Sequence, residues 1–269
     1  MLKGFKPYYD LDYKQTENQD SIYFIFINGK VVVDECDGKY FFPKTVKPSD
    51  KESYIFLGSF QNTYCYLNID IQNNEDNFTT YHLREMYQVI DDNFFILMGY
   101  MYHLYSWLKD NKHCGRCGNK IFLSKNELSL TCNKCKKSVY PSVYPAIIVA
   151  IVKDNKILLA SSPRFNSKFY SVLAGFVNPG ESLEECIRRE VKEEVNIDIK
   201  NIQYFDSQAW PFSQSLMIGF TAEYVAGELK PDGIEILDAN WFEVEKLPSI
   251  PGSISIARSL IDWFIETYK

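Results

Sequence analysis

The sequence predicts an α+β protein with a zinc ribbon between two larger parts. Three observations support this fold class: strand-like runs alternate with helical stretches, two Cys-x2-Cys pairs stand near the middle of the chain, and a short glutamate-rich helix interrupts the strands of the second half. A length of 269 residues suits about two domains. We expect a small α+β domain over residues 1–111, a ribbon over 112–138 and a second domain over 139–269.

The composition argues against several classes of protein. Hydrophobic residues make up 46% of the chain, which is enough for well-filled cores. The net charge of −6 gives no overall basic field for non-specific binding of nucleic acid. The first residues lack the apolar core of a signal peptide, and the most apolar run, Phe94–Met98, is too short to cross a membrane. We therefore expect a cytoplasmic protein.

Strand patterns come first in the N-terminal part, and helical spacing follows. Asn28-Gly29 suits a type I′ turn, so residues 22–27 and 30–33 are predicted to form a hairpin. Helices are expected over 81–89 and 92–108, where apolar residues recur with a helical period. The other expectations are an irregular lead-in over 1–20, strands over 53–58 and 64–69, and a polar loop over 73–77.

Cysteines in the middle of the chain predict a structural metal site. The chain has seven cysteines, and an odd number without a secretion signal favours a reducing compartment and a metal over disulfides. Four of them form two Cys-x2-Cys pairs, which can supply a closed tetrahedral zinc site: Cys114, Cys117, Cys132 and Cys135. A short hairpin over 121–131 would bring the pairs together. Four free thiols are a poor alternative explanation, and His113 is a competing ligand that the cysteines make unnecessary. Because ribbons often bind nucleic acid, that alternative function stays open.

The second domain is predicted to consist of strands and two helices. After a Tyr-Pro linker at 140–145, residues 146–152 form a continuous apolar run that is typical of a buried strand. A closing amphipathic helix is expected over 254–268. The other expected elements are strands over 156–160, 170–175, 199–210, 216–225 and 239–243, with a polar loop over 164–169.

A helix over residues 183–195 carries the most informative chemistry. Ser182 and Glu185 form the S-x-x-E pattern of a capping box, and apolar residues recur every four positions after it. One face of this helix holds three carboxylates: Glu190, Glu193 and Glu194. Like charges at this spacing destabilise a helix unless a cation offsets them, and Mg²⁺ prefers carboxylate oxygens. A solvated acidic face is the alternative, and the wider spacing argues against it.

The wider spacing resembles the signature of the Nudix hydrolase family. Gly175, Glu181 and the run Arg189-Glu190-Val191-Lys192-Glu193-Glu194-Val195-Asn196-Ile197 match the Nudix box G-x5-E-x7-R-E-U-x-E-E-x-G-U, in which U is a large aliphatic residue. Asn196 is the one departure, and Asn is the next best residue after glycine at positive φ.

The resemblance implies a fold and a reaction. The fold would be the Nudix α/β/α sandwich over about residues 140–269, and the reaction would be hydrolysis of a nucleoside diphosphate linked to another group. Divalent ions, Mg²⁺ or Mn²⁺, held by the three glutamates would lower the pKa of the attacking water. Arg189 would orient a carboxylate, and Glu181 would be an outer metal ligand or a cap.

A second segment resembles the NADH pyrophosphatase branch of this family. The run Ser207-Gln-Ala-Trp-Pro-Phe-Ser-Gln-Ser215 is similar to the branch signature S-Q-P-W-P-F-P-x-S, with Ala209 and Ser213 in place of two prolines. Trp210 and Phe212 could stack on a nicotinamide or adenine ring, and polar side chains beside them could bind ribose or phosphate. An aromatic loop packed on the core is the alternative. The substrate contacts expected in this segment are Gln208, Ala209, Trp210, Pro211, Phe212, Ser213, Gln214 and Ser215.

The order of parts along the chain also resembles this branch. Carried over by motif, Tyr140, Ala257 and Glu127 would be further substrate contacts, and Ala174 and Glu235 would join Glu190 and Glu194 around the metal. The resemblance implies a homodimer that hydrolyses NADH and NAD⁺ to AMP and nicotinamide mononucleotide, and that could also remove NAD from RNA 5′ ends. Another substrate of the same family, such as ADP-ribose, is the alternative.

Overall fold

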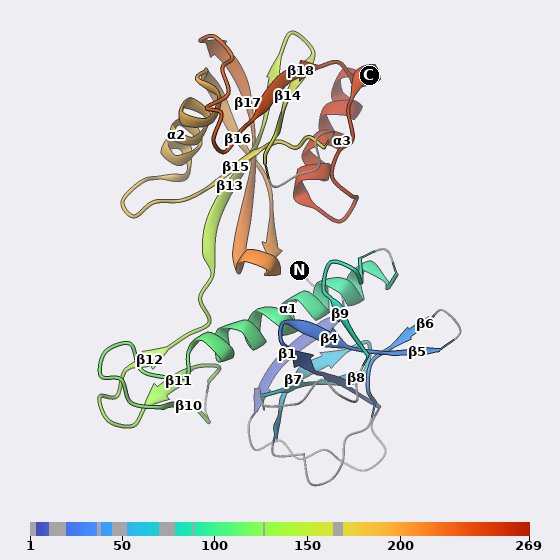
Figure 1. The fold of residues 1–269 in the computed structure, drawn as a ribbon, viewed down its shortest axis with the longest axis vertical. Helices are drawn as coiled ribbons and strands as arrows, with labels where there is room; N and C mark the ends of the chain where they lie inside the picture. Colours follow the sequence, from blue (N-terminus) through green and yellow to red (C-terminus); the bar gives the residue numbers. More distant parts are fainter. Residues whose placement is uncertain are drawn as a thin grey trace. The chain divides into compact units, whose positions relative to one another are not determined.

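A computed structural model describes residues 4–10, 20–36, 39–44, 53–69, 79–87, 89–125, 127–163 and 169–269 (Figure 1). The chain divides into two units, Met1–Ser142 and Val143–Lys269, and each unit has hydrophobic clusters of its own. The expected polar loops over 73–77 and 164–169 lie outside the described residues, apart from Phe169.

The first unit is built on a four-stranded sheet. Its order is β1 (Phe5–Asp10), β7 (Tyr54–Phe60), β8 (Thr63–Asn68) and β2 (Ser21–Phe24). The irregular lead-in expected over residues 1–20 is therefore wrong for β1, which pairs with the long strand β7 through Phe5 and Phe60. Tyr23, Phe56 and Tyr66 form a row of buried rings across three strands.

The predicted hairpin at Asn28-Gly29 is confirmed. Strands β3 (Phe26–Ile27) and β4 (Lys30–Val32) pair around Asn28 at φ 51° and Gly29 at φ 82°, as a type I′ turn requires. Strands β5 (Asp34–Cys36) and β6 (Lys39–Phe41) form a separate pair.

The expected helix over 81–89 is wrong. Residues Thr80–His82 form β9, in which Tyr81 pairs with Val31 of β4, and turns follow. Leu83 and Met86 are nevertheless buried, so the apolar residues of this segment mark contact with the core and not a helix. Strand pairing with β4 outweighed the short helical pattern.

The long helix of the first unit is confirmed as α1 (Asp92–Asp110). Its N-terminus is capped by Asp91, whose Oδ1 accepts hydrogen bonds from the backbone N–H groups of Asn93 and Phe94 at 3.0 and 3.3 Å. The helix packs on the strands through aromatic rings, including Tyr105 against Phe26 with centroids 5.1 Å apart. After it come the three short strands of the ribbon: β10 (Ile121–Leu123), β11 (Leu130–Cys132) and β12 (Ser138–Val139).

The second unit is a mixed sheet covered by a helix on each face. The strand order is β16 (Asp198–Trp210), β17 (Ser215–Ala226), β13 (Tyr144–Lys153), β14 (Lys156–Ser161) and β18 (Asp238–Phe242), and β15 (Leu173–Phe176) also pairs with β13. Strands β13 and β17 are parallel, and the other pairs are antiparallel. Two short 3₁₀ turns, η3 (Pro211–Ser213) and η4 (Val244–Lys246), complete the unit.

Alternation along β13 produces two cores. Ile147, Val149 and Ile151 pack toward α2 (Leu183–Val195), whereas Ile148, Ala150 and Val152 pack toward α3 (Ile256–Tyr268). Figure 1 shows α2 and α3 on opposite sides of this sheet. The α/β/α sandwich is thereby confirmed, and α2 has the predicted bounds.

Within the described part of the chain, no helix combines the length and the apolar character needed to cross a membrane.

Candidate active site and metal centre

The two ends of α2 are capped by the residues that the sequence motif predicted there. Ser182 accepts a hydrogen bond from the Glu185 backbone N–H at 3.3 Å, and Glu185 accepts one from the Ser182 backbone N–H at 2.7 Å, so the capping box is confirmed. Asn196 ends the helix in the left-handed region at φ 59°. Its side-chain amide donates to the carbonyl of Glu228 at 3.2 Å, a bond that glycine could not make. Asparagine thus adopts the left-handed conformation for which the motif normally uses glycine.

Gly175 is required because Glu190 lies against its backbone. A Cβ atom at position 175 would lie 2.1 Å from Cδ and 2.3 Å from Oε1 of Glu190, far inside van der Waals contact. Gly175 is in β15 and Glu190 is in α2. The glycine of the motif therefore creates the space in which a helix carboxylate approaches the sheet.

Arg189 organises three of the carboxylates. Its guanidinium donates to Glu181 at 2.6 and 3.0 Å, to Glu190 at 2.8 Å and to Glu193 at 3.1 Å. The hydrogen bond from Arg189 lowers the pKa of Glu181 to about 2, so Glu181 stays charged. A fifth bond, to the carbonyl of Phe176 at 3.1 Å, ties this network to β15. Arg189 is thus a partner for carboxylates in the described structure.

Glu194 is the most unusual group of the set. Glu194 is buried, with 7% of the residue exposed, and its Oε2 has no hydrogen-bond partner among the described residues. Burial raises the pKa of Glu194 to about 8, and the negative charges of Glu190 and Glu235 add to the increase. A buried carboxylate without a partner is costly, and a hard cation would supply the missing interaction.

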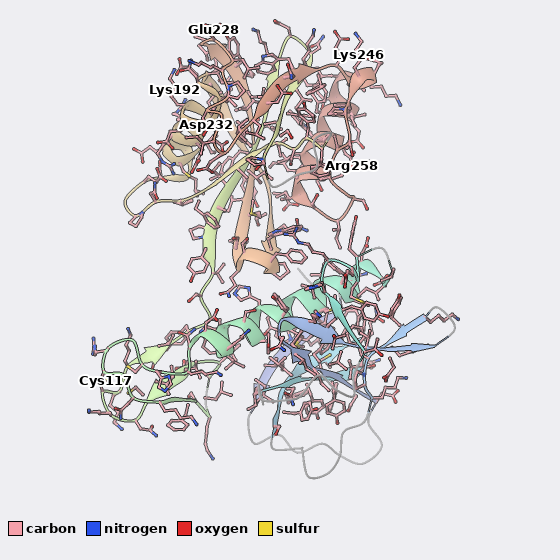
Figure 2. All side chains as sticks on the ribbon, viewed as in Figure 1. Cys117, Lys192, Glu228, Asp232, Lys246 and Arg258 are labelled. Carbon is pink, nitrogen blue, oxygen red and sulfur yellow. The ribbon has the colours of Figure 1, made fainter. Side chains whose placement is uncertain are left out.

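The loop that carries Glu235 is fastened to the end of α2. The backbone N–H of Asp232 donates to the carbonyl of Glu194 at 3.0 Å, and Figure 2 labels Asp232 near α2. The Asp232 carboxylate in turn accepts backbone hydrogen bonds from Ile234, Glu235 and Ile236. Burial raises the pKa of Asp232, but these N–H groups outweigh burial and the net pKa is lowered. Sequence reasoning missed Asp232, although the turn dipeptide Asp232-Gly233 was a signal for it.

The expected metal ligands of α2 are neighbours but not a closed set. In the described part of the chain, only the four cysteines bring three or more potential ligand atoms within 4.8 Å of one another. Glu190 and Glu193 each direct an oxygen to Arg189, and the side chain of Glu193 is 61% exposed. Ala174 lies beside Gly175 in β15, where it pairs with Ile148. The described carboxylates would therefore have to shift to share one ion.

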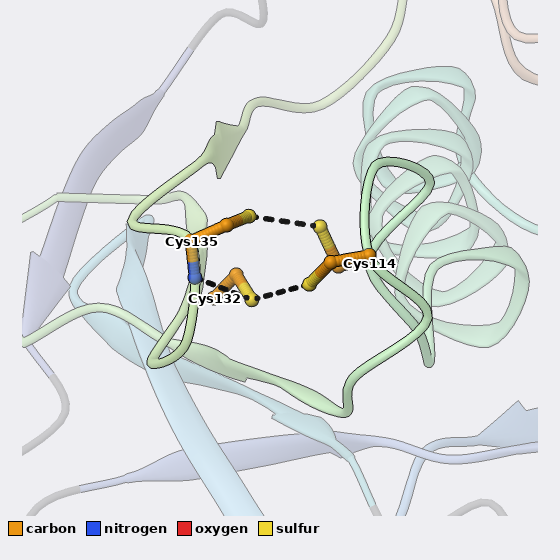
Figure 3. Close-up of side chains that lie close together, drawn as sticks. Cys114, Cys132 and Cys135 are labelled. Atoms are coloured by element: carbon orange, nitrogen blue, oxygen red, sulfur yellow. Dashed lines mark hydrogen bonds between the residues drawn. The ribbon is translucent and has the colours of Figure 1, made fainter.

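The four cysteines do form a closed set. Figure 3 shows the cluster, in which the sulfur of Cys114 lies 3.5 Å from that of Cys135, and the sulfur of Cys117 lies 3.5 Å from that of Cys132. These separations exclude disulfides, whose S–S bond is about 2.05 Å. They are near the roughly 3.8 Å expected between sulfurs about 2.3 Å from one tetrahedral ion. Backbone N–H groups lower the pKa of Cys114 to about 6 and also lower that of Cys132, which favours the thiolate. For Cys117, the backbone N–H of Asn119 is outweighed by burial and the neighbouring sulfurs, which raise the pKa to about 11. The donor set fits a tetrahedral metal.

The segment from Ser207 to Ser215 is the tip of a hairpin. Its first four residues pair with β17, η3 makes the turn, and Gln214 completes it at φ 51°. The rings of Trp210 and Phe212 meet edge to face with centroids 5.1 Å apart, and both are half-buried. Ser215 is buried, and its hydroxyl lies 2.8 Å from that of Ser213. The tip is therefore ordered by strand pairing, without the two prolines of the signature.

Gln208 is engaged with the main chain at the start of α3. Its Nε2 donates to the carbonyl of Ile254 at 2.6 Å, and its Oε1 accepts from the backbone N–H of Ile256 at 2.7 Å. Both ends of the amide are used, so Gln208 fixes the N-terminal end of α3 to β16. Ala257, expected to contact substrate, follows in the first turn of α3 and is 8% exposed.

Tyr140 and Glu127 meet in the first unit. The Tyr140 hydroxyl donates to Oε1 of Glu127 at 3.0 Å, and the hydroxyl of Ser129 donates to the same oxygen at 3.1 Å. The hydrogen bond to Glu127 raises the pKa of Tyr140. Tyr140 and Glu127, each expected to contact substrate, are thus direct hydrogen-bond partners. Tyr140 remains exposed.

Comparison with known proteins gives a family match and similar relatives. Residues 143–264 match the NUDIX domain. A protein of Stutzerimonas stutzeri named NAD-capped RNA hydrolase NudC is 44% identical over 183 residues, which cover 68% of this chain and 66% of the relative. A protein of Pseudomonas fluorescens strain Pf-5 with the same name is 46% identical over 175 residues, which cover 65% and 63% of the two chains.

The aligned part of this chain spans just under two thirds of the length of these relatives. Among solved structures, a NUDIX hydrolase from Nitrosomonas europaea has a TM-score of 0.50 at 22% identity, covering 58% of this chain and 90% of that one. This likeness supports the fold alone.

Proposed function

The chain belongs to the Nudix family, and from this premise we propose that it hydrolyses the diphosphate bond of NADH and NAD⁺. The products are AMP and reduced or oxidised nicotinamide mononucleotide. The observation that carries the proposal is Glu194, a buried carboxylate with an unpartnered oxygen beside Glu190 and Glu235. The name of the relatives, NAD-capped RNA hydrolase, supports the choice of substrate, because an NAD cap contains the same diphosphate bond.

The chain's carboxylates have distinct parts in the proposed reaction. A divalent cation, Mg²⁺ or Mn²⁺, held by Glu190, Glu194, Glu235 and the Ala174 carbonyl would supply positive charge to the diphosphate and lower the pKa of the attacking water. Water attacks one phosphorus, the bridging P–O bond breaks, and a carboxylate of the α2 face accepts the proton of the water. Glu193 is the most exposed of the three catalytic glutamates, and its side chain faces solvent.

Arg189 and Gly175 set the positions of these groups. Arg189 holds Glu190 and Glu193 through charged hydrogen bonds, which are stronger than neutral ones. Gly175 lets the Glu190 carboxylate approach β15. Catalysis by positioned charge depends on such preorganisation.

The hairpin tip from Ser207 to Ser215 selects the substrate in this proposal. Trp210 and Phe212 offer rigid aromatic faces for a nicotinamide or adenine ring. Gln208 acts as a positioning residue, because its amide already binds the start of α3. The remaining members of the contact set are Tyr140, Glu127, Ala209, Pro211, Ser213, Gln214, Ser215 and Ala257.

The four-cysteine cluster holds a structural Zn²⁺ in this proposal. All four ligands come from the chain, which leaves no open position for chemistry. The described cysteines form no disulfide, which suits a reducing cytoplasm. By the family resemblance, the working form is a homodimer, and sedimentation of the purified protein tests that assignment.

Product analysis tests the proposal directly. The purified protein, with Mg²⁺ or Mn²⁺ added, is given NADH, NAD⁺, NAD-capped RNA, ADP-ribose and a diadenosine substrate in parallel. We expect AMP and nicotinamide mononucleotide from the first two, and RNA with a 5′-monophosphate from the third. Much faster cleavage of ADP-ribose than of NADH would overturn the choice of substrate. The Glu194→Gln variant should lose about two orders of magnitude in rate or more, because an ion held at this site contributes several kcal/mol.

A further inference from the structure

The ribbon has a charge opposite to that of the rest of the chain. Residues 112–138 contain seven lysine and arginine residues and one glutamate, a net charge of +6. Because the whole chain carries −6, the remaining residues carry −12. The one acidic residue, Glu127, is occupied by the hydroxyls of Tyr140 and Ser129. The ribbon is therefore a local basic surface on an acidic protein.

The basic side chains of the ribbon are exposed, and two of them lie within the cysteine turns. All seven are exposed: Lys112, Arg116, Lys120, Lys125, Lys134, Lys136 and Lys137. Arg116 lies between Cys114 and Cys117, and Lys134 lies between Cys132 and Cys135. Because the four sulfurs lie within 4.8 Å of one another, folding brings together the two turns that carry Arg116 and Lys134. The fold thus joins two cation-bearing turns that are separate in the sequence.

An exposed aromatic ring lies beside one of these cations. Phe122 is 47% exposed, and the Lys120 ammonium lies 5.8 Å from the centre of its ring. The strand register places Phe122 opposite Thr131, and Thr131 opposite Ser138, so these three side chains share the face that is turned away from buried Ile121 and Cys132. A ring, hydroxyls and flanking cations are the elements with which proteins bind single-stranded nucleic acid.

We propose that the ribbon binds the sugar–phosphate chain of single-stranded RNA. The inference rests on the proposed function, because only a substrate with NAD at the 5′ end of an RNA has a sugar–phosphate chain for the ribbon to bind. The free dinucleotide has no such chain. Arg116, Lys134 and Lys137 neutralise phosphates, and Phe122 stacks on a base. Phe122 is the single Phe, Tyr or Trp residue in the sequence 112–138, and one ring is too little apolar surface to insert into a membrane, so RNA fits this surface better than a lipid bilayer does.

A charge-removal variant with matched controls tests the inference. The variant R116Q/K134Q/K137Q removes three charges from the ribbon, K200Q/K246Q/K269Q removes three from the second unit, and R116K/K134R/K137R keeps the ribbon charge. Fluorescence anisotropy measures the binding of a labelled RNA of about 12 nucleotides, with a 5′-hydroxyl and no NAD, to each full-length protein between 50 and 200 mM salt. Zinc content and thermal unfolding confirm that the ribbon is folded.

We expect the ribbon Gln variant to bind RNA at least tenfold more weakly at about 100 mM salt, with a log–log salt slope smaller by about 2, since each neutralised phosphate contributes about 0.7. The second-unit variant and the charge-keeping variant should bind like the wild type, and hydrolysis of free NADH should be unchanged in all three.

Three results would overturn the inference: equal RNA affinity in the wild type and the ribbon Gln variant, an equal loss in the second-unit variant, or wild-type binding to vesicles containing phosphatidylserine but not to RNA. If the Gln variant fails to fold, the wild-type salt titration decides, because affinity that does not change with salt contradicts phosphate contacts. Absence of NADH hydrolysis with ribbon-dependent RNA binding would instead overturn the proposed function.

Discussion

Glu194 is held in the folded chain at a cost in stability when no cation is bound. Burial raises its pKa from 4.5 to about 8. Between these values the folded state keeps a proton that the unfolded chain has released. The stability contributed by the protonated group is therefore fully present below about pH 4.5 and is lost as the pH rises to about 8, by about 1.4 kcal/mol for each pH unit.

We expect Glu194→Gln to be more stable than the wild type at pH 8 when both are kept in a chelator, because glutamine carries no charge to bury. The difference should shrink as the pH falls and disappear near pH 4.5. Urea unfolding across this range measures it. Glu184→Gln is the control, since Glu184 is exposed on the first turn of the same helix and should show no such trend. A wild type as stable as Glu194→Gln at pH 8 would contradict this account of the buried carboxylate.

Gly175 gives a second prediction at the residue scale. In Gly175→Ala the new methyl group overlaps Glu190, so either the carboxylate or β15 must move. We expect a loss of about 1–3 kcal/mol in the free energy of unfolding, as for other overpacked sites, together with a lower rate of NADH hydrolysis. Denaturant unfolding and steady-state kinetics measure the two effects.

A double-mutant cycle separates this clash from a general effect on β15. Adding Glu190→Ala to Gly175→Ala removes the overlapping group, so the double variant should lose less stability than the sum of the two single variants. Strict additivity of the two losses would show that Glu190 does not account for the glycine.

At the scale of the element, the end of α2 depends on one left-handed residue. Asn196 has φ 59°, a conformation that costs most L-residues about 1–2 kcal/mol and that asparagine adopts more readily. We expect Asn196→Ala to lower the free energy of unfolding by about that amount. Asn196→Gly should be nearly neutral, because glycine gains conformational freedom but loses the bond to the carbonyl of Glu228. Thermal unfolding of both variants measures the difference, and equal losses would argue against backbone strain as the cause.

Elements set by short-range signals could be predicted, and those set by distant partners could not. The capping box, the Asn-Gly turn and α2 follow from residues within one or two turns of each other, and all three are confirmed. The segment over 81–89 was expected to be helical because its apolar residues have a helical spacing, yet β9 forms against β4, about fifty residues earlier in the chain. Contacts at that distance are invisible to local patterns.

The same limit applies at the scale of the whole molecule. Spacing alone predicted the four-cysteine cluster and the carboxylate face, because each rests on a motif within one segment. It predicted neither the bonds from Gln208 to the start of α3 nor the fastening of the Asp232 loop to α2, since each joins segments more than 35 residues apart. Motif reasoning therefore finds the reactive groups of a site before the contacts that hold them.

Removal of the ribbon metal gives a prediction for the whole molecule. The two cores of the second unit consist entirely of residues from Ile147 onward, whereas the ribbon has three short strands and depends on its four cysteines. Small zinc domains obtain their folding energy from the metal. In a variant with both Cys132→Ser and Cys135→Ser, we expect loss of one zinc per chain and fast amide hydrogen exchange over 112–139, with protection of β13 and β17 unchanged.

Cys65→Ala is the matched control for this variant. Cys65 is buried in β8, and burial raises its pKa to about 12, so it is a neutral thiol outside the metal cluster. This control should keep its zinc and its ribbon protection even if the cavity left by the thiol lowers the stability of the first unit. If β13 and β17 exchanged as fast as the ribbon in the Cys132→Ser, Cys135→Ser variant, the second unit would need the zinc site for its own stability. Such a result would mean that its two cores are insufficient, and the separation of the catalytic fold from the metal-stabilised ribbon would have to be abandoned.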